Sequence, residues 1–136
     1  MDAAGALADL TEISSQIEAA VVLDEAGAVV ASTIEDPERT QRLARTAVDL
    51  LGAAEKRFES GGRALTQLEA ALREGSVFVA REEGRSIVAT TGSEPTSGLV
   101  FFDLRACLRS LSEPKKARPT RRSGKAASVE EGVADA

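Results

Sequence analysis

The sequence contains no histidine, tryptophan or tyrosine, and only one of its 136 residues is a cysteine. Histidine is the commonest general acid or base in enzymes and the commonest metal ligand. Without it, a single cysteine has no partner for nucleophilic catalysis or for a metal centre. We therefore expect a protein that is not an enzyme and that has no catalytic, cofactor-binding or metal-binding residues.

Long apolar runs and paired cysteines are missing too. No run approaches the roughly 18 residues that cross a bilayer, and Cys107 has no second cysteine with which to form a disulfide within the chain. The first ten residues carry acids and lack the basic start and apolar segment of a secretory signal. These absences predict a cytoplasmic protein.

Aromatic residues make up only 3% of the sequence, all of them Phe, although 43% of the residues are hydrophobic. The core must therefore consist mainly of aliphatic side chains. A domain of roughly 110 residues buries only about two-thirds of the surface of its unfolded chain. Because a thin aliphatic core gains stability when two copies share it, we expect a homodimer.

Basic residues are scarce over most of the chain. Residues 1–111 hold 11 Lys and Arg against 18 Asp and Glu, a balance of −7, whereas residues 112–136 hold 6 against 4, a balance of +2. An acidic body repels phosphates, so we expect no nucleic-acid binding beyond weak contact through the basic tail. The tail is polar and lacks apolar periodicity, which predicts one domain at 1–111 and a disordered charged tail at 112–136.

Apolar spacing locates the first elements. Leu7, Leu10, Ile13 and Ile17 recur every three or four residues, which predicts an amphipathic helix from Ala3 to about Ser15 with these side chains on its buried face. A β-hairpin should follow, with strands at 18–24 and 28–32 and with Gly27 free to take the positive φ of a tight turn.

A long helix should begin at Asp36-Pro37, because Asp can cap free N–H groups and Pro fits the first helical position. Its apolar stripe runs to Phe58, where Ser60-Gly61-Gly62 predicts a loop. That glycine pair lacks the Gly-Lys-Ser/Thr ending of a phosphate-binding loop.

Residues 64–72 are ambiguous, because Leu65, Leu68 and Leu72 have helical spacing. The β-branched run at 76–80 needs a neighbouring strand, however, so we interpret 64–72 as that strand. A further strand at 86–91 completes a three-stranded meander. A last helix is expected from Leu99 to about Leu111, capped by Thr96 or Ser97, with Val100, Phe101, Leu104, Leu108 and Leu111 on its buried face.

Several local phrases match a known family in order and spacing. They are Ile17–Asp24 with Gly27, Leu65–Glu69, Gly75–Val79 and Gly98–Arg105. Together with the order of elements, they make residues 3–111 resemble the roadblock dynein light-chain family, and in particular its bacterial, MglB-like members.

The resemblance implies an α/β fold of profilin and longin type. In such a fold a five-stranded antiparallel sheet carries the long middle helix on one face and the two terminal helices on the other, and two copies form a homodimer. Members of the family associate with Ras-like small GTPases, as scaffolds or as activators of GTP hydrolysis, or with dynein complexes. The implied function is a non-catalytic interaction module that binds and regulates or scaffolds a Ras-like small GTPase. Two alternatives stay open: a scaffolding dimer with no effect on a nucleotide cycle, and a sensor that encloses a small ligand.

The long helix carries more apolar surface than one sheet face needs, and the excess indicates a dimer or partner interface. The expected interface residues are Ala44, Ala47, Val48, Leu50, Leu51 and Ala54. Arg39, Arg42 and Arg45 advance by three along the same helix and are candidate contacts to an acidic partner, although a solvated helix face is the commoner reason for such a pattern.

Three acids flank the first hairpin: Glu18, Asp24 and Glu25. They could be read as a metal cluster or an acid–base pair. Carboxylates at strand ends are more often solvated turn residues, and no histidine completes a site, so we assign them no chemistry. Cys107 is expected to behave as a small buried hydrophobe.

Overall fold

The structure is a computed structural model that describes residues 2–57 and 65–112. The elements along the chain are α1 (Ala3–Ile13), β1 (Ile17–Leu23), β2 (Val29–Ser32), α2 (Pro37–Arg57), β3 (Gln67–Ala71), β4 (Ser76–Glu82), β5 (Arg85–Thr91) and α3 (Ser97–Ser112). The predicted helix end at Phe58, the loop at Gly61 and Gly62, and the tail from residue 113 onward lie outside the described residues. Ser112, which was assigned to the tail, ends α3.

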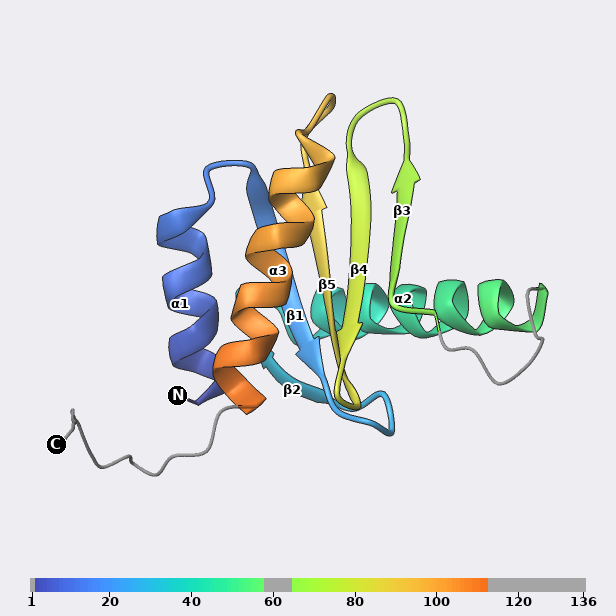
Figure 1. Cartoon of the computed structure of the whole chain (residues 1–136), viewed down its shortest axis with the longest axis horizontal. Coiled ribbons are helices and arrows are strands. Elements are labelled where there is room, and N and C mark those ends of the chain that lie inside the picture. Colours follow the sequence, from blue (N-terminus) through green and yellow to red (C-terminus); the bar gives the residue numbers. More distant parts are fainter. Residues whose placement is uncertain (1, 58–64, 113–136) are drawn as a thin grey trace, which may run out of the picture.

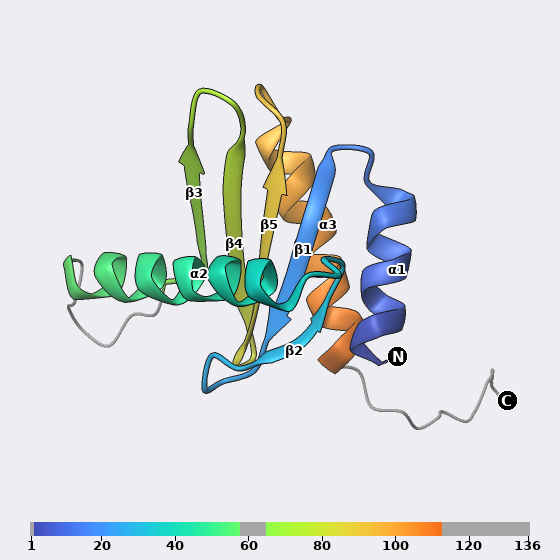
Figure 2. The same cartoon turned by 180° about the vertical axis from the view of Figure 1, so that it is seen from behind.

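The strands form one antiparallel sheet in the order β2-β1-β5-β4-β3. Helix α2 crosses one face of this sheet, while α1 and α3 lie side by side on the other (Figures 1 and 2). This is the layered architecture expected from the sequence, and the prediction of fold class is confirmed.

Alternation along the strands gives each face of the sheet its own core. Phe78 and Ile87 point to the α1–α3 side and are fully buried with Leu104. Their chain neighbours Val79 and Val88 point to the α2 side and pack with Leu51. Each such apolar side chain contributes about 1.5–3 kcal/mol relative to remaining in water. Both layers are therefore held mainly by side chains of the central strands.

Aspartates begin two of the helices. The backbone N–H of Gly5 donates to Asp2 Oδ1 over 2.9 Å at the start of α1. At the start of α2, the N–H of Glu38 donates to Asp36 Oδ1 over 3.0 Å, and Pro37 takes the first helical position. The helix start predicted at Asp36-Pro37 is confirmed.

The stretch that was ambiguous between helix and strand, residues 64–72, contains the strand β3. Gln67–Ala71 pairs with β4 in a continuous register from Gln67 opposite Ala80 to Ala71 opposite Ser76. Tertiary pairing thus overrides the helical spacing of the leucines, and the interpretation as a strand is confirmed.

The position predicted for Ile13 is wrong. Helix α1 ends there rather than near Ser15, because Ser14 has extended φ and ψ of −100° and 119°. Ile13 is 71% exposed, whereas Ile17 is buried as the first residue of β1. Apolar spacing that continues across a helix end does not imply one common face.

Candidate protein-interaction surface

The predicted interface residues of α2 divide into two groups. Ala44, Ala47 and Leu51 are buried and pack against the chain's own sheet, beside Val21 and Val88. Their packing against the sheet holds α2 in place. Any partner that reaches α2 must therefore use the remaining positions.

Leu50 and Ala54 are half-buried, as is Leu43 one helical repeat earlier. Spacings of seven and four residues place these three on one side of the helix. We call them the α2 shoulder. Val48 is 44% exposed and lies on the opposite side, where its Cγ2 is 3.2 Å from the position that a Cβ would take at Gly27. Gly27 itself has a φ of +86°, as the predicted turn requires.

The sheet beneath the α2 shoulder is only partly covered. Helix α2 runs across the strands and extends past the β3 edge (Figure 2). On the same face, Leu68, Ala70 and Val77 are half-buried, and Leu72, just after β3, is 66% exposed. Because β3 is the last strand in the described sheet, its outer backbone groups form an open edge, which natural proteins usually cover.

Sequence reasoning missed this part of the surface. Leu68, Ala70 and Leu72 alternate in the strand pattern, and that alternation is the signal that could have found it. Arg81 anchors the adjoining end of α2, since its guanidinium pairs with Glu55 and its Nε donates to the carbonyl of Leu65 over 3.2 Å. The α2 shoulder and the β3 edge are thereby fixed relative to each other.

Arg39, Arg42 and Arg45 are all exposed on the outer side of α2. None of them forms an ion pair with another described residue. Their spacing of three turns them gradually around the helix, so they make a broad basic surface rather than a single row. This surface faces away from the sheet.

The three acids near the first hairpin do not form one cluster. Glu18 lies at the start of β1, and Asp24 and Glu25 follow the end of that strand. Asp24 organises the turn, because its Oδ1 accepts from the N–H groups of Ala26 and Ala28, each over 2.9 Å. Within residues 2–57 and 65–112, no three potential ligands are arranged to hold a metal ion.

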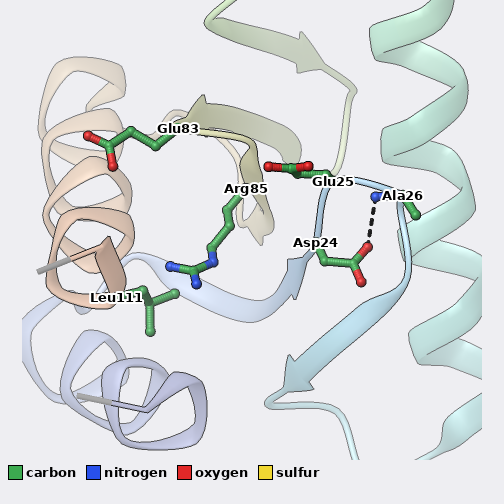
Figure 3. Close-up of a pocket in the computed structure, with 6 residues that line it drawn as sticks. All are labelled: Asp24, Glu25, Ala26, Glu83, Arg85 and Leu111. Carbon is green, nitrogen blue, oxygen red and sulfur yellow. Dashed lines mark hydrogen bonds between the residues drawn. The ribbon is translucent and has the colours of Figure 1, made fainter. Parts of the chain in front are cut away.

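An open hollow of about 530 Å³ lies beside this turn (Figure 3). Its lining residues come from the β1–β2 turn, the β4–β5 turn and the end of α3: Asp24, Glu25, Ala26, Glu83, Arg85 and Leu111. Glu25 packs against Gly84, whose φ is +83° and where an added Cβ would collide with the Glu25 carboxylate. The hollow is therefore formed by two hairpin turns in contact, and its charges are mixed.

Cys107 lies in α3 and is 6% exposed. Burial, and then the negative charge of Asp9, raises the pKa of its thiol from 9.0 to about 11. The reactive thiolate is therefore scarce at neutral pH. This is the opposite of the lowered pKa that a catalytic cysteine requires.

We expect the native protein to react with iodoacetamide far more slowly at pH 8 than the same protein in denaturant. The raised pKa also means that the unfolded thiol ionises first, so folding stability should fall as pH rises from about 9 towards about 11. Mass spectrometry after timed alkylation measures the first effect. Equal rates in native and denatured protein would contradict the buried position of Cys107.

No helix in the described ranges is long and apolar enough to cross a membrane. By sequence, no protein-family model matches the chain, and no curated protein matches it either. The comparison with solved structures is the informative one.

A Roadblock/LC7 domain from Streptomyces avermitilis matches with a TM-score of 0.71 and 20% identity, over 82% of this chain and 96% of that one. MglB from Myxococcus xanthus matches with a TM-score of 0.62 and 14% identity, over 81% and 91%. LokiProfilin1, in a complex with rabbit actin, matches with a TM-score of 0.56 and 11% identity, over 81% and 93%. What the chain shares with these proteins at such identities is the fold, and that fold is the one of the Roadblock/LC7 domains.

Proposed function

We propose that this chain is a cytoplasmic, homodimeric interaction module that binds a Ras-like small GTPase and regulates or scaffolds it, without being an enzyme. The observation that carries the proposal is the half-covered apolar surface at the α2 shoulder, next to the open β3 edge, in a chain with the Roadblock/LC7 fold. The family that the sequence resembles provides the kind of partner.

The dimer seam is assigned to the apolar side chains that a single chain covers only in part. Leu50 and Ala54 of the α2 shoulder belong to it, together with Leu43, the uncovered strip of β3 and Leu72. A second copy related by a two-fold axis presents the same strip, so each shoulder covers apolar surface of the other copy. Such a seam also closes the β3 edge against unwanted strand pairing.

The GTPase surface is assigned to the outer side of α2, which stays free in this dimer. Arg39, Arg42 and Arg45 are exposed there and have no ion-pair partner among the described residues. Long basic side chains on a rigid helix can reach acidic groups of a docked partner and accelerate its association.

Replacing Arg42 and Arg45 together with Glu is expected to weaken GTPase binding at least about tenfold, because two attractive charges become repulsive. The measurement is a fluorescence titration of a Ras-like GTPase encoded in the same genomic neighbourhood, loaded with a labelled, non-hydrolysable GTP analogue. Arg73→Glu, at an exposed turn between β3 and β4, is a single charge reversal outside this surface and should leave the affinity unchanged.

Hydrolysis measured with and without the protein separates regulation from scaffolding. Faster GTP hydrolysis at saturating protein identifies a regulator, and binding with an unchanged rate identifies a scaffold. If the unmodified protein binds no form of the GTPase, with GDP or with the GTP analogue, the proposed partner is wrong.

A further inference from the structure

The face opposite α2 carries an apolar surface that the proposed dimer does not use. Ile13, Leu99 and Phe102 are 71%, 51% and 64% exposed, which makes them three of the most exposed large hydrophobic residues in the described chain. All three lie on the terminal helices α1 and α3. Contiguous exposed apolar surface is characteristic of interaction sites.

A groove of about 150 Å³ runs between these helices. We call it the α1–α3 groove, and its lining residues are Ala6, Asp9, Leu10, Ile13, Asp103, Ala106, Cys107 and Ser110. Leu99 stands four residues before Asp103, and Phe102 stands four residues before Ala106, so both extend the wall of the groove outward along α3. The exposed apolar residues and the groove thus form one surface.

Asp103 gives this surface its chemical preference. Its side chain lines the groove and is only 9% exposed, yet it has no hydrogen bond or ion pair with any other described residue. A carboxylate in the wall of a largely apolar groove favours a cation on the ligand that fills the groove, because a charge-assisted hydrogen bond is stronger than a neutral one. Asp9 adds a second carboxylate, and α1 contains no basic residue.

We propose that the α1–α3 groove docks an amphipathic helix of a partner protein, whose apolar ridge covers Ile13, Leu99 and Phe102 and whose Lys or Arg side chain pairs with Asp103. Two parallel or antiparallel helices leave a groove of the shape that a third helix fills. The acids favour a basic partner over a second copy. Two copies docked by this face would bring two grooves that both carry Asp9 and Asp103 close together, and like charges oppose association.

The test uses the full-length protein and a labelled model helix of about 18 residues, long enough to be helical on the surface. Leucines occupy one face of this peptide and lysines flank them, and a matched peptide has glutamate in place of lysine. Fluorescence anisotropy should show that the lysine peptide binds at least about tenfold more tightly than the glutamate peptide. Asp103→Asn should remove most of that preference.

Phe102→Ala should weaken the lysine peptide at least about tenfold, as the loss of an aromatic anchor does. Val30→Ala, at a residue of β2 that is 49% exposed, is the matched control and should change nothing. The mass of each variant in solution shows whether the dimer persists, which separates this site from the seam proposed above.

Three results would overturn the proposal. The first is no binding of the lysine peptide at millimolar concentration. The second is equal binding of both peptides. The third is binding that emerges only after Arg121 and Arg122 are replaced with Glu, since the groove would then be occupied by the basic tail of the same chain rather than by a partner.

Discussion

Leu50→Asp is expected to convert a species of twice 14.2 kDa into a monomer or an aggregate, as measured by light scattering after size-exclusion chromatography. The half-buried Leu50 lies on the α2 shoulder, in the middle of the proposed seam. A carboxylate at this position would have to lose its water on dimerisation without gaining a partner, which costs several kcal/mol. At about 1.4 kcal/mol per tenfold, that is enough to abolish a micromolar dimer.

The matched control is Gln41→Asp on the same helix. Gln41 is exposed and lies seven residues before Val48, on the side of α2 opposite the α2 shoulder, so its replacement should leave the dimer intact. If Leu50→Asp gives an unchanged dimer, the seam lies elsewhere. If the unmodified protein is a monomer at high concentration, the α2 shoulder has another partner.

The sequence predicted the elements well where local chemistry decides the backbone. Asp36-Pro37 begins α2, and Gly27 forms the hairpin turn, because capping and positive φ depend on a few neighbouring atoms. The strand at β3 needed a further step, from the requirement that β4 have a neighbour. Local periodicity alone would have made it a helix.

Periodicity alone could not show which residues of the apolar stripe of α2 contact the sheet and which are left for a partner. Ala47 and Leu51 meet the sheet while Leu50 and Ala54 form the α2 shoulder, yet all four belong to one continuous stripe. Which side of the stripe is covered depends on where the helix crosses the sheet and where the sheet ends. Both are tertiary properties that no helical repeat contains.

The α1–α3 groove could not be predicted from the sequence for a related reason. Asp103 resembles in the sequence an ordinary surface acid that follows two Phe residues, and nothing local indicates that its side chain will lie against α1. Ile13 was placed on the buried face because its spacing continues that of Leu10. The helix ends at Ile13, so the same spacing leaves its side chain exposed.

Two alanine substitutions at Phe residues separate folding from binding. Phe78 is fully buried in β4 and packs edge-on against Phe101, with ring centroids 5.0 Å apart. Phe78→Ala should therefore lower the free energy of unfolding by about 3–5 kcal/mol, through lost burial, an empty cavity and a lost aromatic pair. Because small domains are stable by only about 5–15 kcal/mol, this variant should lose a large part of its free energy of unfolding at room temperature.

The matched substitution Phe102→Ala should change the unfolding free energy by less than about 0.5 kcal/mol, because Phe102 is 64% exposed and alanine favours helix. Chemical denaturation monitored by circular dichroism measures both variants. A large loss of stability in Phe102→Ala would mean that this side chain serves the fold, and its exposure would no longer point to a partner. A small loss leaves an aromatic residue on α3 that folding does not need, in a chain that has only four of them. Its position beside the unpaired carboxylate of Asp103 then makes recognition the remaining physical reason for it.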